Sequence, residues 1–185
     1  IKVKVLDGTT NTLVDAASGS QKGAFYIKGH PEFSQSGTLN VVGNVKHAIK
    51  AGEYIEVKDV NINVTSAAGD AINCSQYFLM KSGTINSSGV EDDGIQCDID
   101  DIEVGSTGQT TDHEDEDSGN IYLEGGAIRI NIAGKAAKGI KSEGDMIISG
   151  GTINVTTTGH GKWDDEDLKT KAAACLSSDA KVVIS

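Results

Sequence analysis

The sequence predicts an all-β protein, a single-stranded parallel β-helix with three short strands in each coil of about 23 residues. Three observations predict this fold: an internal repeat, alternation of apolar and polar residues inside each repeated phrase, and a composition rich in glycine and poor in aromatic residues. The repeat is clearest from Gly83 to Cys97, and similar stretches precede and follow it. Because the first and last phrases begin and end abruptly, we expect one β-helix domain over residues 1–185 that forms an internal part of a longer chain.

The first phrase of each repeat resembles Gly-Thr-Ile-Asn-Val. Its copies begin at Gly37, Val60, Gly83, Gly126 and Gly151, so successive starts are 23, 23, 43 and 25 residues apart. Such a repeat is too short for a βαβ unit or a propeller blade. Successive side chains alternate across a strand, so the aliphatic residues of this phrase point inward and the residue at its fourth position points outward. The predicted outward column contains Asn40, Asn63, Asn86, Arg129 and Asn154.

Two further apolar phrases complete each coil. The second phrase places one aliphatic residue in a common register, and we expect these side chains to stack in one interior column: Ile49, Ile72, Ile95, Ile140 and Leu176. The third phrase begins at Tyr54, Tyr77, Asn120, Asp145 and Lys181. Residues 1–36 are expected to form an irregular first coil, and about twenty residues are inserted between Cys97 and Ile121. In a solenoid, insertions of this kind map to loops.

The charge of the chain excludes several classes of partner. Its formal net charge is −11, whereas proteins that bind nucleic acid or an anionic membrane surface present basic patches. No apolar run approaches the roughly 18 residues of a membrane span, so direct membrane insertion is not expected. An acidic surface favours cations as partners.

The three cysteines are too few for a disulfide framework. Cys74 and Cys97 share a register one coil apart, and neighbouring strands lie about 4.8 Å from each other, which does not exclude a disulfide. We expect instead two stacked, buried thiols, because free cysteine behaves as a small apolar residue. Cys175 is also expected to be a free thiol.

The acidic groups predict calcium. Asp70 and Asp93 share one register in neighbouring coils, which places their carboxylates about 5 Å apart, where like charges repel. Calcium removes the repulsion, because it accepts roughly six to eight oxygen ligands in irregular geometry. Runs of acidic residues also form ordinary solvated loops, which is the alternative for residues 112–117. The candidate ligands are Asp70, Asp92, Asp93, Asp98, Asp100, Asp112, Asp115 and Asp117.

Several phrases together resemble a known family. They begin at Gly43 (GNVKHAIKAGEY), Glu91 (EDDGIQC), Thr111 (TDHEDEDSGNIY), Ala137 (AKGIKSEGD) and Thr170 (TKAAACLSSD). These phrases are similar to the bacterial carbohydrate-binding family of pectate-lyase-like β-helices found in cellulolytic clostridia. The resemblance spans nearly the whole chain. It implies a right-handed parallel β-helix, bound calcium, a secreted or cell-surface location, and binding of polygalacturonate and cellulose, without implying catalysis.

We therefore expect a non-catalytic module that binds acidic plant polysaccharide in a calcium-dependent manner, and cellulose as well. The candidate carbohydrate-binding residues are Trp163, Arg129, Asn86 and Asn154. Trp163 is the only tryptophan and is expected on a loop, where it either stacks on a sugar face or covers an edge of the core.

Other functions remain as alternatives. A calcium-dependent pectate lyase would need a positioned base near the metal, and Arg129, Lys138 and Lys141 are the candidates. A structural repeat segment of a surface stalk or fibre would use calcium only for rigidity. A hydrolase is disfavoured, because His160 lies 67 residues after Asp93, nearly three repeats away, whereas cooperating groups should lie on adjacent coils.

Overall fold

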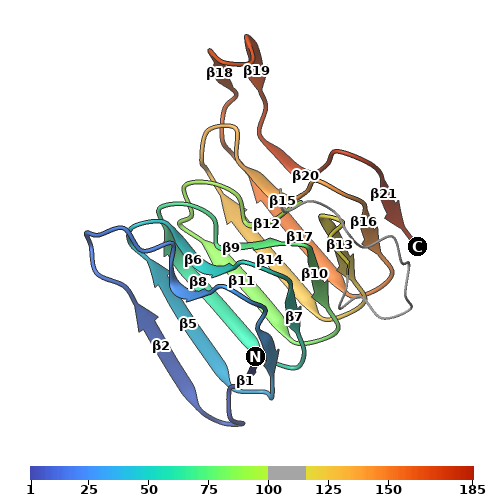
Figure 1. The fold of residues 1–185 in the computed structure, drawn as a ribbon. Coiled ribbons are helices and arrows are strands. Elements are labelled where there is room, and N and C mark those ends of the chain that lie inside the picture. The colour runs from blue at the N-terminus through green and yellow to red at the C-terminus, as the bar shows by residue number, and fades with distance from the viewer. Residues whose placement is uncertain (100–115) are drawn as a thin grey trace.

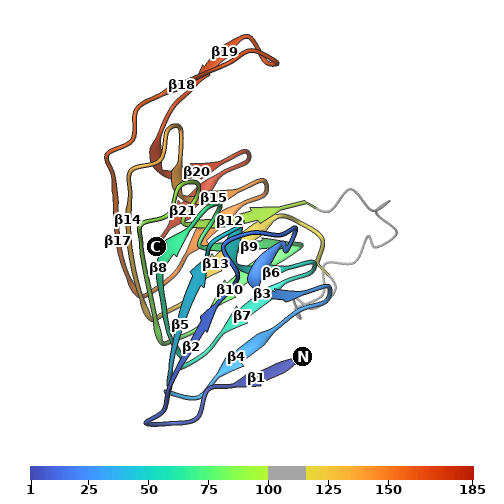
Figure 2. The ribbon, with the colours of Figure 1, turned by 90° about the vertical axis from the view of Figure 1, so that its left-hand side faces the viewer.

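Three parallel β-sheets form the protein, and the chain visits them in turn, so that each coil contributes one strand to each sheet (Figure 1). The computed structural model describes residues 1–99 and 116–185. Seen from the side, the coils stack along one axis (Figure 2). This arrangement confirms the predicted all-β parallel β-helix. Among the described residues, no helix is long and apolar enough to cross a membrane.

The strands follow the three predicted phrases. Sheet A has the order β1 (Lys2–Lys4), β4 (Glu32–Ser34), β7 (Ile55–Val57), β10 (Tyr77–Met80), β13 (Asn120–Leu123), β16 (Met146–Ile148) and β21 (Val182–Ile184). Sheet B has the order β2 (Thr10–Val14), β5 (Thr38–Gly43), β8 (Asn61–Ala67), β11 (Thr84–Ser88), β14 (Ala127–Ile132) and β17 (Thr152–Thr157). Sheet C has the order β3 (Gly23–Ile27), β6 (His47–Ala51), β9 (Ile72–Ser75), β12 (Ile95–Asp98), β15 (Lys138–Ser142) and β20 (Ala174–Ser178). Residues 1–36 already supply a strand to each sheet, so the first coil is more regular than expected.

The predicted interior column exists in sheet C. The parallel register pairs Ile49 with Ile72, Ile72 with Ile95, Ile95 with Ile140, and Ile140 with Leu176. The four isoleucines are fully buried, and Leu176 in the last coil is partly buried. Burial of a large aliphatic side chain stabilises a fold by about 1.5–3 kcal/mol, so this column is a major part of the core.

The inward residues of sheet B extend the same core. The buried members are Leu39, Val41, Ile62, Val64, Ile85, Ile128 and Ile130, and the partly buried members in the last coil are Ile153 and Val155. The alternation predicted for the first phrase is therefore confirmed.

The corner between sheets A and B explains the glycine that opens most copies of the first phrase. Gly83, Gly126 and Gly151 have φ angles of +91°, +82° and +87°, which favour glycine. The coils also touch here, because a Cβ added to Gly126 would lie 2.8 Å from the carbonyl oxygen of Gly83. Glycine recurs at this position because the turn is left-handed and leaves no room for a side chain.

A small second cluster of buried residues lies apart from the main core. It contains Tyr54, Tyr77 and Leu79, with Tyr122 packed against them. The rings of Tyr54 and Tyr77 stack with centroids 4.5 Å apart, and His30 stacks on Tyr54 at 4.1 Å. Similar side chains in neighbouring coils therefore stack on each other outside the main core as well as inside it.

The cysteines are free thiols, as predicted. Cys74 and Cys97 are paired in register and buried, and Cys175 is exposed. Burial, followed by the neighbouring Cys74, raises the pKa of the Cys97 thiol. A buried thiol that stays protonated has low reactivity, so this pair serves packing.

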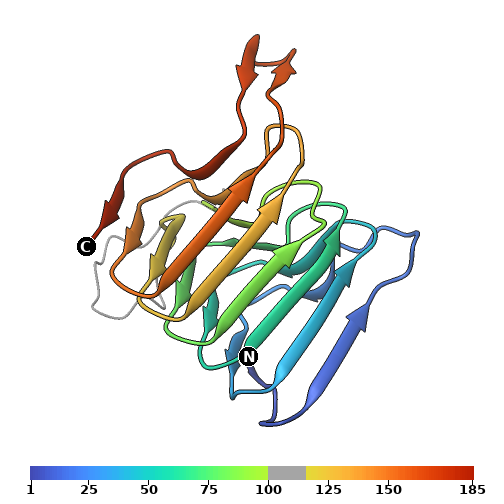
Figure 3. The same ribbon diagram turned by 180° about the vertical axis from the view of Figure 1, so that it is seen from behind.

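A two-stranded hairpin projects from the last coil (Figures 1 and 3). Its antiparallel strands are β18 (Lys162–Asp164) and β19 (Lys169–Lys171). Trp163 lies in β18 and pairs with Thr170, so the prediction of a loop for this residue was wrong. The hairpin is supported by ion pairs of Lys171 with Asp164 and Asp167 at 2.5 and 3.5 Å. Paired strands arise here because the insertion doubles back on itself and the short segments satisfy each other's backbone groups.

Replacing Ile95 tests the interior column. Ile95→Ala should lower the free energy of unfolding by about 2–5 kcal/mol, because it leaves a cavity between two fully buried neighbours, and Ile95→Asp should prevent folding, because it buries a charge without a partner. Denaturant unfolding measures the effect. Gln96→Ala, on the same strand but partly exposed, is the control and should change stability by less than about 1 kcal/mol. Equal effects at the two positions would contradict the assigned faces.

Candidate functional site

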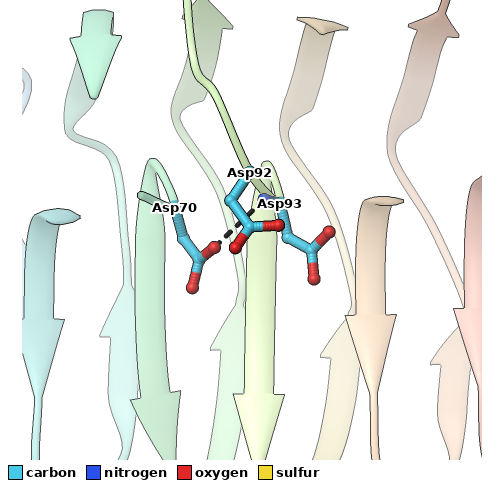
Figure 4. A group of neighbouring side chains, drawn as sticks. All are labelled: Asp70, Asp92 and Asp93. Atoms are coloured by element: carbon cyan, nitrogen blue, oxygen red, sulfur yellow. Dashed lines mark hydrogen bonds between the residues drawn. The ribbon is translucent and has the colours of Figure 1, made fainter. Parts of the chain in front are cut away.

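Three carboxylates meet at the corner between sheets B and C. One oxygen from each of Asp70, Asp92 and Asp93 lies within 4.8 Å of the others, and the Asp92 carboxylate lies between the other two in the view of Figure 4. Asp70 and Asp93 are 2% and 5% exposed, whereas Asp92 is exposed. The cluster therefore has two buried members and one member open to solvent.

The coil register places these side chains together. Ile72 pairs with Ile95, so Asp70 and Asp93, each two residues before its strand, are neighbours. The carboxylates also hold successive coils: Asp70 Oδ1 accepts the Asp93 amide N–H at 3.0 Å, and Asp93 Oδ1 accepts the Lys138 amide N–H at 2.5 Å. Part of the role of both aspartates is thus to satisfy backbone N–H groups at the corner.

Residues beside the cluster surround Asp70 more fully than the other two aspartates. Asn73 Nδ2 donates to Asp70 Oδ2 at 2.6 Å, and Lys50 Nζ donates to Asn73 Oδ1 at 2.5 Å. His47 Nδ1 lies 3.1 Å from the Asp70 amide nitrogen and 3.2 Å from Asp70 Oδ2. Nδ1 cannot serve both contacts at once. The buried amide needs an acceptor, which favours the tautomer with the proton on Nε2.

His47 was not among the residues predicted for this site. The repeat could have predicted this contact, because His47 precedes Asp70 by 23 residues, the length of one coil.

Loss of solvent at the corner, together with the neighbouring carboxylates, raises the pKa of two members of the cluster. Asp92 is the exposed member, but partial desolvation at the corner, and then the charge of Asp70, still raises its pKa. Burial raises the pKa of Asp93 to about 7, with further upward contributions from Asp70 and Asp92. The hydrogen bond from the Lys138 amide and the charge of Lys141 lower it again. The cluster is therefore poorly compensated when all three groups are ionised.

The cluster offers suitable donors for a hard cation. Within the described residues, the Asp92 carboxylate and Asp93 Oδ2 make no hydrogen bond, while both oxygens of Asp70 are occupied. All available ligands are oxygens, the donor type that calcium prefers. Asp92 and Asp93 would supply most of the free donors for an ion, with Asp70 completing the anionic pocket.

Among the described residues, two further predicted ligands, Asp98 and Asp117, do not join this cluster. Asp98 lies at the far end of β12 and accepts a hydrogen bond from Gln96 Nε2 at 2.5 Å. Asp117 lies in the segment that precedes β13. Asp100, Asp112 and Asp115 lie outside the described residues.

The outer face of sheet B carries the predicted asparagine column. Asn63 Nδ2 donates to Asn40 Oδ1 at 3.0 Å, and Asn86 Nδ2 donates to Asn63 Oδ1 at 2.9 Å. Arg129 is paired in register with Asn86 on one side and Asn154 on the other, and it is exposed. These side chains line an open groove of about 460 Å³. Asn86, Arg129 and Asn154, three of the four predicted carbohydrate-binding residues, therefore share one surface.

The three basic residues considered for a lyase lie on two surfaces. Arg129 is in the middle of β14 on sheet B, whereas Lys138 and Lys141 belong to β15 of sheet C. The Lys138 ammonium donates to the carbonyl oxygens of Ala136 and Ala172 at 2.6 and 2.5 Å. Lys141 is one of the charges that act on the acidic cluster. Nothing in this arrangement places Arg129 beside the acidic cluster.

Trp163 belongs to the corner between sheets B and C, not to the groove of sheet B. Its hairpin connects β17 of sheet B to β20 of sheet C, and it projects beyond the coils (Figure 2). The side chain is 56% exposed. It thus rises from the same edge as the acidic cluster, two coils further along.

A family model described as carbohydrate-binding domain-containing protein matches residues 1–185 of the sequence. The chain belongs to this family. The carbohydrate-binding domain is also similar in structure to a polysaccharide lyase-like protein from C. thermocellum, solved as a gadolinium derivative, with a TM-score of 0.68 and 16% sequence identity. At that identity the likeness supports the fold alone. The match covers 100% of this chain and 64% of that one, and no curated protein matches. The family resemblance of the sequence motifs is confirmed.

The raised pKa of Asp93 predicts how stability depends on pH without metal. Its folded value of about 7 exceeds its ordinary value of 3.8, so the folded chain binds more protons between these values. The contribution of Asp93 to stability is complete below pH 4 and is lost as pH rises to about 7, at up to about 1.4 kcal/mol per pH unit.

Asp93→Asn should remove this pH dependence and raise stability at pH 8 in chelator, because the amide oxygen can still accept the Lys138 N–H. Denaturant unfolding between pH 4 and pH 8 measures it. Asp179→Asn, at an exposed turn, is the control and should keep the parental slope. An unchanged slope in Asp93→Asn would show that Asp93 titrates normally.

Proposed function

We propose that this carbohydrate-binding domain is a non-catalytic module that binds acidic plant polysaccharide, such as polygalacturonate, through calcium held by Asp70, Asp92 and Asp93. The observation that carries the proposal is the carboxylate cluster at the corner between sheets B and C, with two members buried and unpaired oxygens on Asp92 and Asp93. The family supplies the general function. The location that we propose is the cell surface or the extracellular medium.

Charge explains why a cation is needed. The chain has a net charge of −11, and a polyuronate is also anionic, so direct contact at the acidic corner would be repulsive. Calcium held by part of its ligand set can accept further oxygens from a uronate. Lys141 adds a positive charge that already acts on this cluster. The corner thereby becomes attractive to a carboxylate only when the ion is bound.

Trp163 offers a second contact that does not depend on the ion. An exposed indole at the same edge as the cluster can stack on the apolar face of a pyranose ring. We include cellulose among the ligands on this basis, because a neutral glucan needs an aromatic surface and hydrogen bonds but no cation.

Chelation and Asp92→Asn test the calcium bridge. Calcium at about a hundredfold excess over Kd should stabilise the fold by about 2.7 kcal/mol, and its removal should weaken binding to polygalacturonate at least about tenfold, or about 1.4 kcal/mol. Thermal melts and binding isotherms with and without chelator measure both effects. Asp92→Asn should lose both responses, and Asp179→Asn should retain them. Identical melting and binding in calcium and chelator would reject the bridge.

Trp163→Ala tests the aromatic contact. Binding to cellulose should fall about five- to tenfold, which corresponds to roughly 1 kcal/mol for a stacked ring. The calcium-induced rise in melting temperature should be unchanged. Leu168→Ala is a matched control, because Leu168 lies on the same hairpin segment and is 73% exposed. If both variants bind cellulose as the parent does, the hairpin is not a sugar-binding surface.

A further inference from the structure

The outer face of sheet B differs in charge from the rest of the domain. Its six strands contain no aspartate or glutamate and a single charged residue, Arg129. The whole chain carries 27 acidic residues. Figure 3 looks onto this sheet, and its strands lie side by side across the full stack of coils. The strands of this sheet therefore present an anionic ligand with one positive charge and no carboxylate.

The side chains around Arg129 are held in fixed positions. In the asparagine ladder, Asn40, Asn63 and Asn86 each donate one N–H to the preceding coil, the last acceptor being Thr12 Oγ1 at 3.4 Å. An amide has two N–H donors and two acceptor lone pairs, so each ladder member keeps hydrogen-bonding capacity toward solvent. Because neighbouring coils are about 4.8 Å apart, these groups repeat at that interval along the axis.

The ladder ends at Arg129. Within the part of the chain that the structure describes, the guanidinium has no hydrogen bond or ion pair, and Asn86 Oδ1 and the Asn154 amide likewise have no partner. The groove of about 460 Å³ is lined on both sides of Arg129 by amides and hydroxyls, including Ser88 and Thr156. An exposed guanidinium without a counter-charge is well suited to a carboxylate, which it binds in a bidentate manner.

We propose that this groove is a second glycan subsite, which binds a uronate-containing chain without metal, with Arg129 pairing with one sugar carboxylate and the asparagine ladder contacting the hydroxyls of neighbouring sugars. This inference rests on the proposed polysaccharide-binding function and adds a site separate from the acidic corner. The ligand chain runs along the helix axis, across successive coils, because the free amide groups repeat in that direction. No aromatic residue lines the groove, so a charged sugar is favoured over a neutral glucan.

The test is calorimetric titration of the intact domain with tetragalacturonate in chelator at low salt. The parent should bind, Arg129→Gln should bind about tenfold more weakly through loss of a charge-assisted hydrogen bond, and Arg129→Lys should fall between them. The matched control is Lys58→Gln, an equal charge change at an exposed residue next to β7 of sheet A. It should bind as the parent does. Circular dichroism confirms that each variant is folded.

A second probe identifies the group that Arg129 recognises. Fully methyl-esterified tetragalacturonate has the same hydroxyls without the charge, so its binding should be weaker and should change less than about threefold in Arg129→Gln. The proposal is overturned if the folded parent does not bind tetragalacturonate in chelator, or if Arg129→Gln binds it as the parent does. It is also overturned if the Arg129→Gln substitution weakens binding of the acid and of the methyl ester equally. Failure of the calcium bridge would be recognised by a different result. In that case Asp92→Asn would still bind polygalacturonate in a calcium-dependent manner, as the parent does.

Discussion

In-register stacking of parallel coils is the constraint on which the rest of the structure depends. Each strand hydrogen-bonds to the equivalent strand of the next coil, so residues about 23 positions apart become neighbours about 4.8 Å apart. A side chain therefore packs mainly against its own equivalents. Ile72 lies between Ile49 and Ile95 in the core. Every other column of equivalent residues is stacked in the same way, whether or not the contact stabilises the fold.

The energetic result of this stacking depends on the side chain. Isoleucine gains contact on both sides, and asparagine gains a hydrogen bond, because its amide contains both a donor and an acceptor. Aspartate gains nothing from another aspartate, and Asp70 and Asp93 face each other at the corner partly because they accept backbone N–H groups. Those bonds use only one oxygen of Asp93. They do not explain why an aspartate occupies position 92, since the Asp92 carboxylate accepts no backbone N–H among the described residues. Asp92 is thus the member of the cluster whose position points most directly to a ligand.

Most of the fold could be predicted from the sequence, because stacking turns spatial neighbours into a periodic pattern. The register of Ile95 with Ile72 and Ile140 follows from counting residues, and so does the meeting of Asp70 with Asp93. Features without a period could not be found in this way. The hairpin that carries Trp163 has no equivalent in other coils, and its strands are three residues each, too short for alternation to be recognised. Asp98 was grouped with the other acids by composition, whereas strand direction places it at the opposite end of β12.

The absence of acidic residues from sheet B is not required by the fold. Outward positions on the other two sheets accept charge, as Glu56 on sheet A and Lys50 and Lys141 on sheet C show. The outward positions of sheet B are equally compatible with lysine or glutamate, yet around one arginine they carry threonine, serine, asparagine and one alanine. Folding explains the inward residues of these strands and the hydrogen-bonded asparagines, but it does not explain the absence of carboxylates or the single unpaired guanidinium. A surface that contacts an anionic, hydroxyl-rich polymer accounts for both. In the calcium bridge that we propose, the acidic corner solves the same problem differently, because there the positive charge comes from a bound ion.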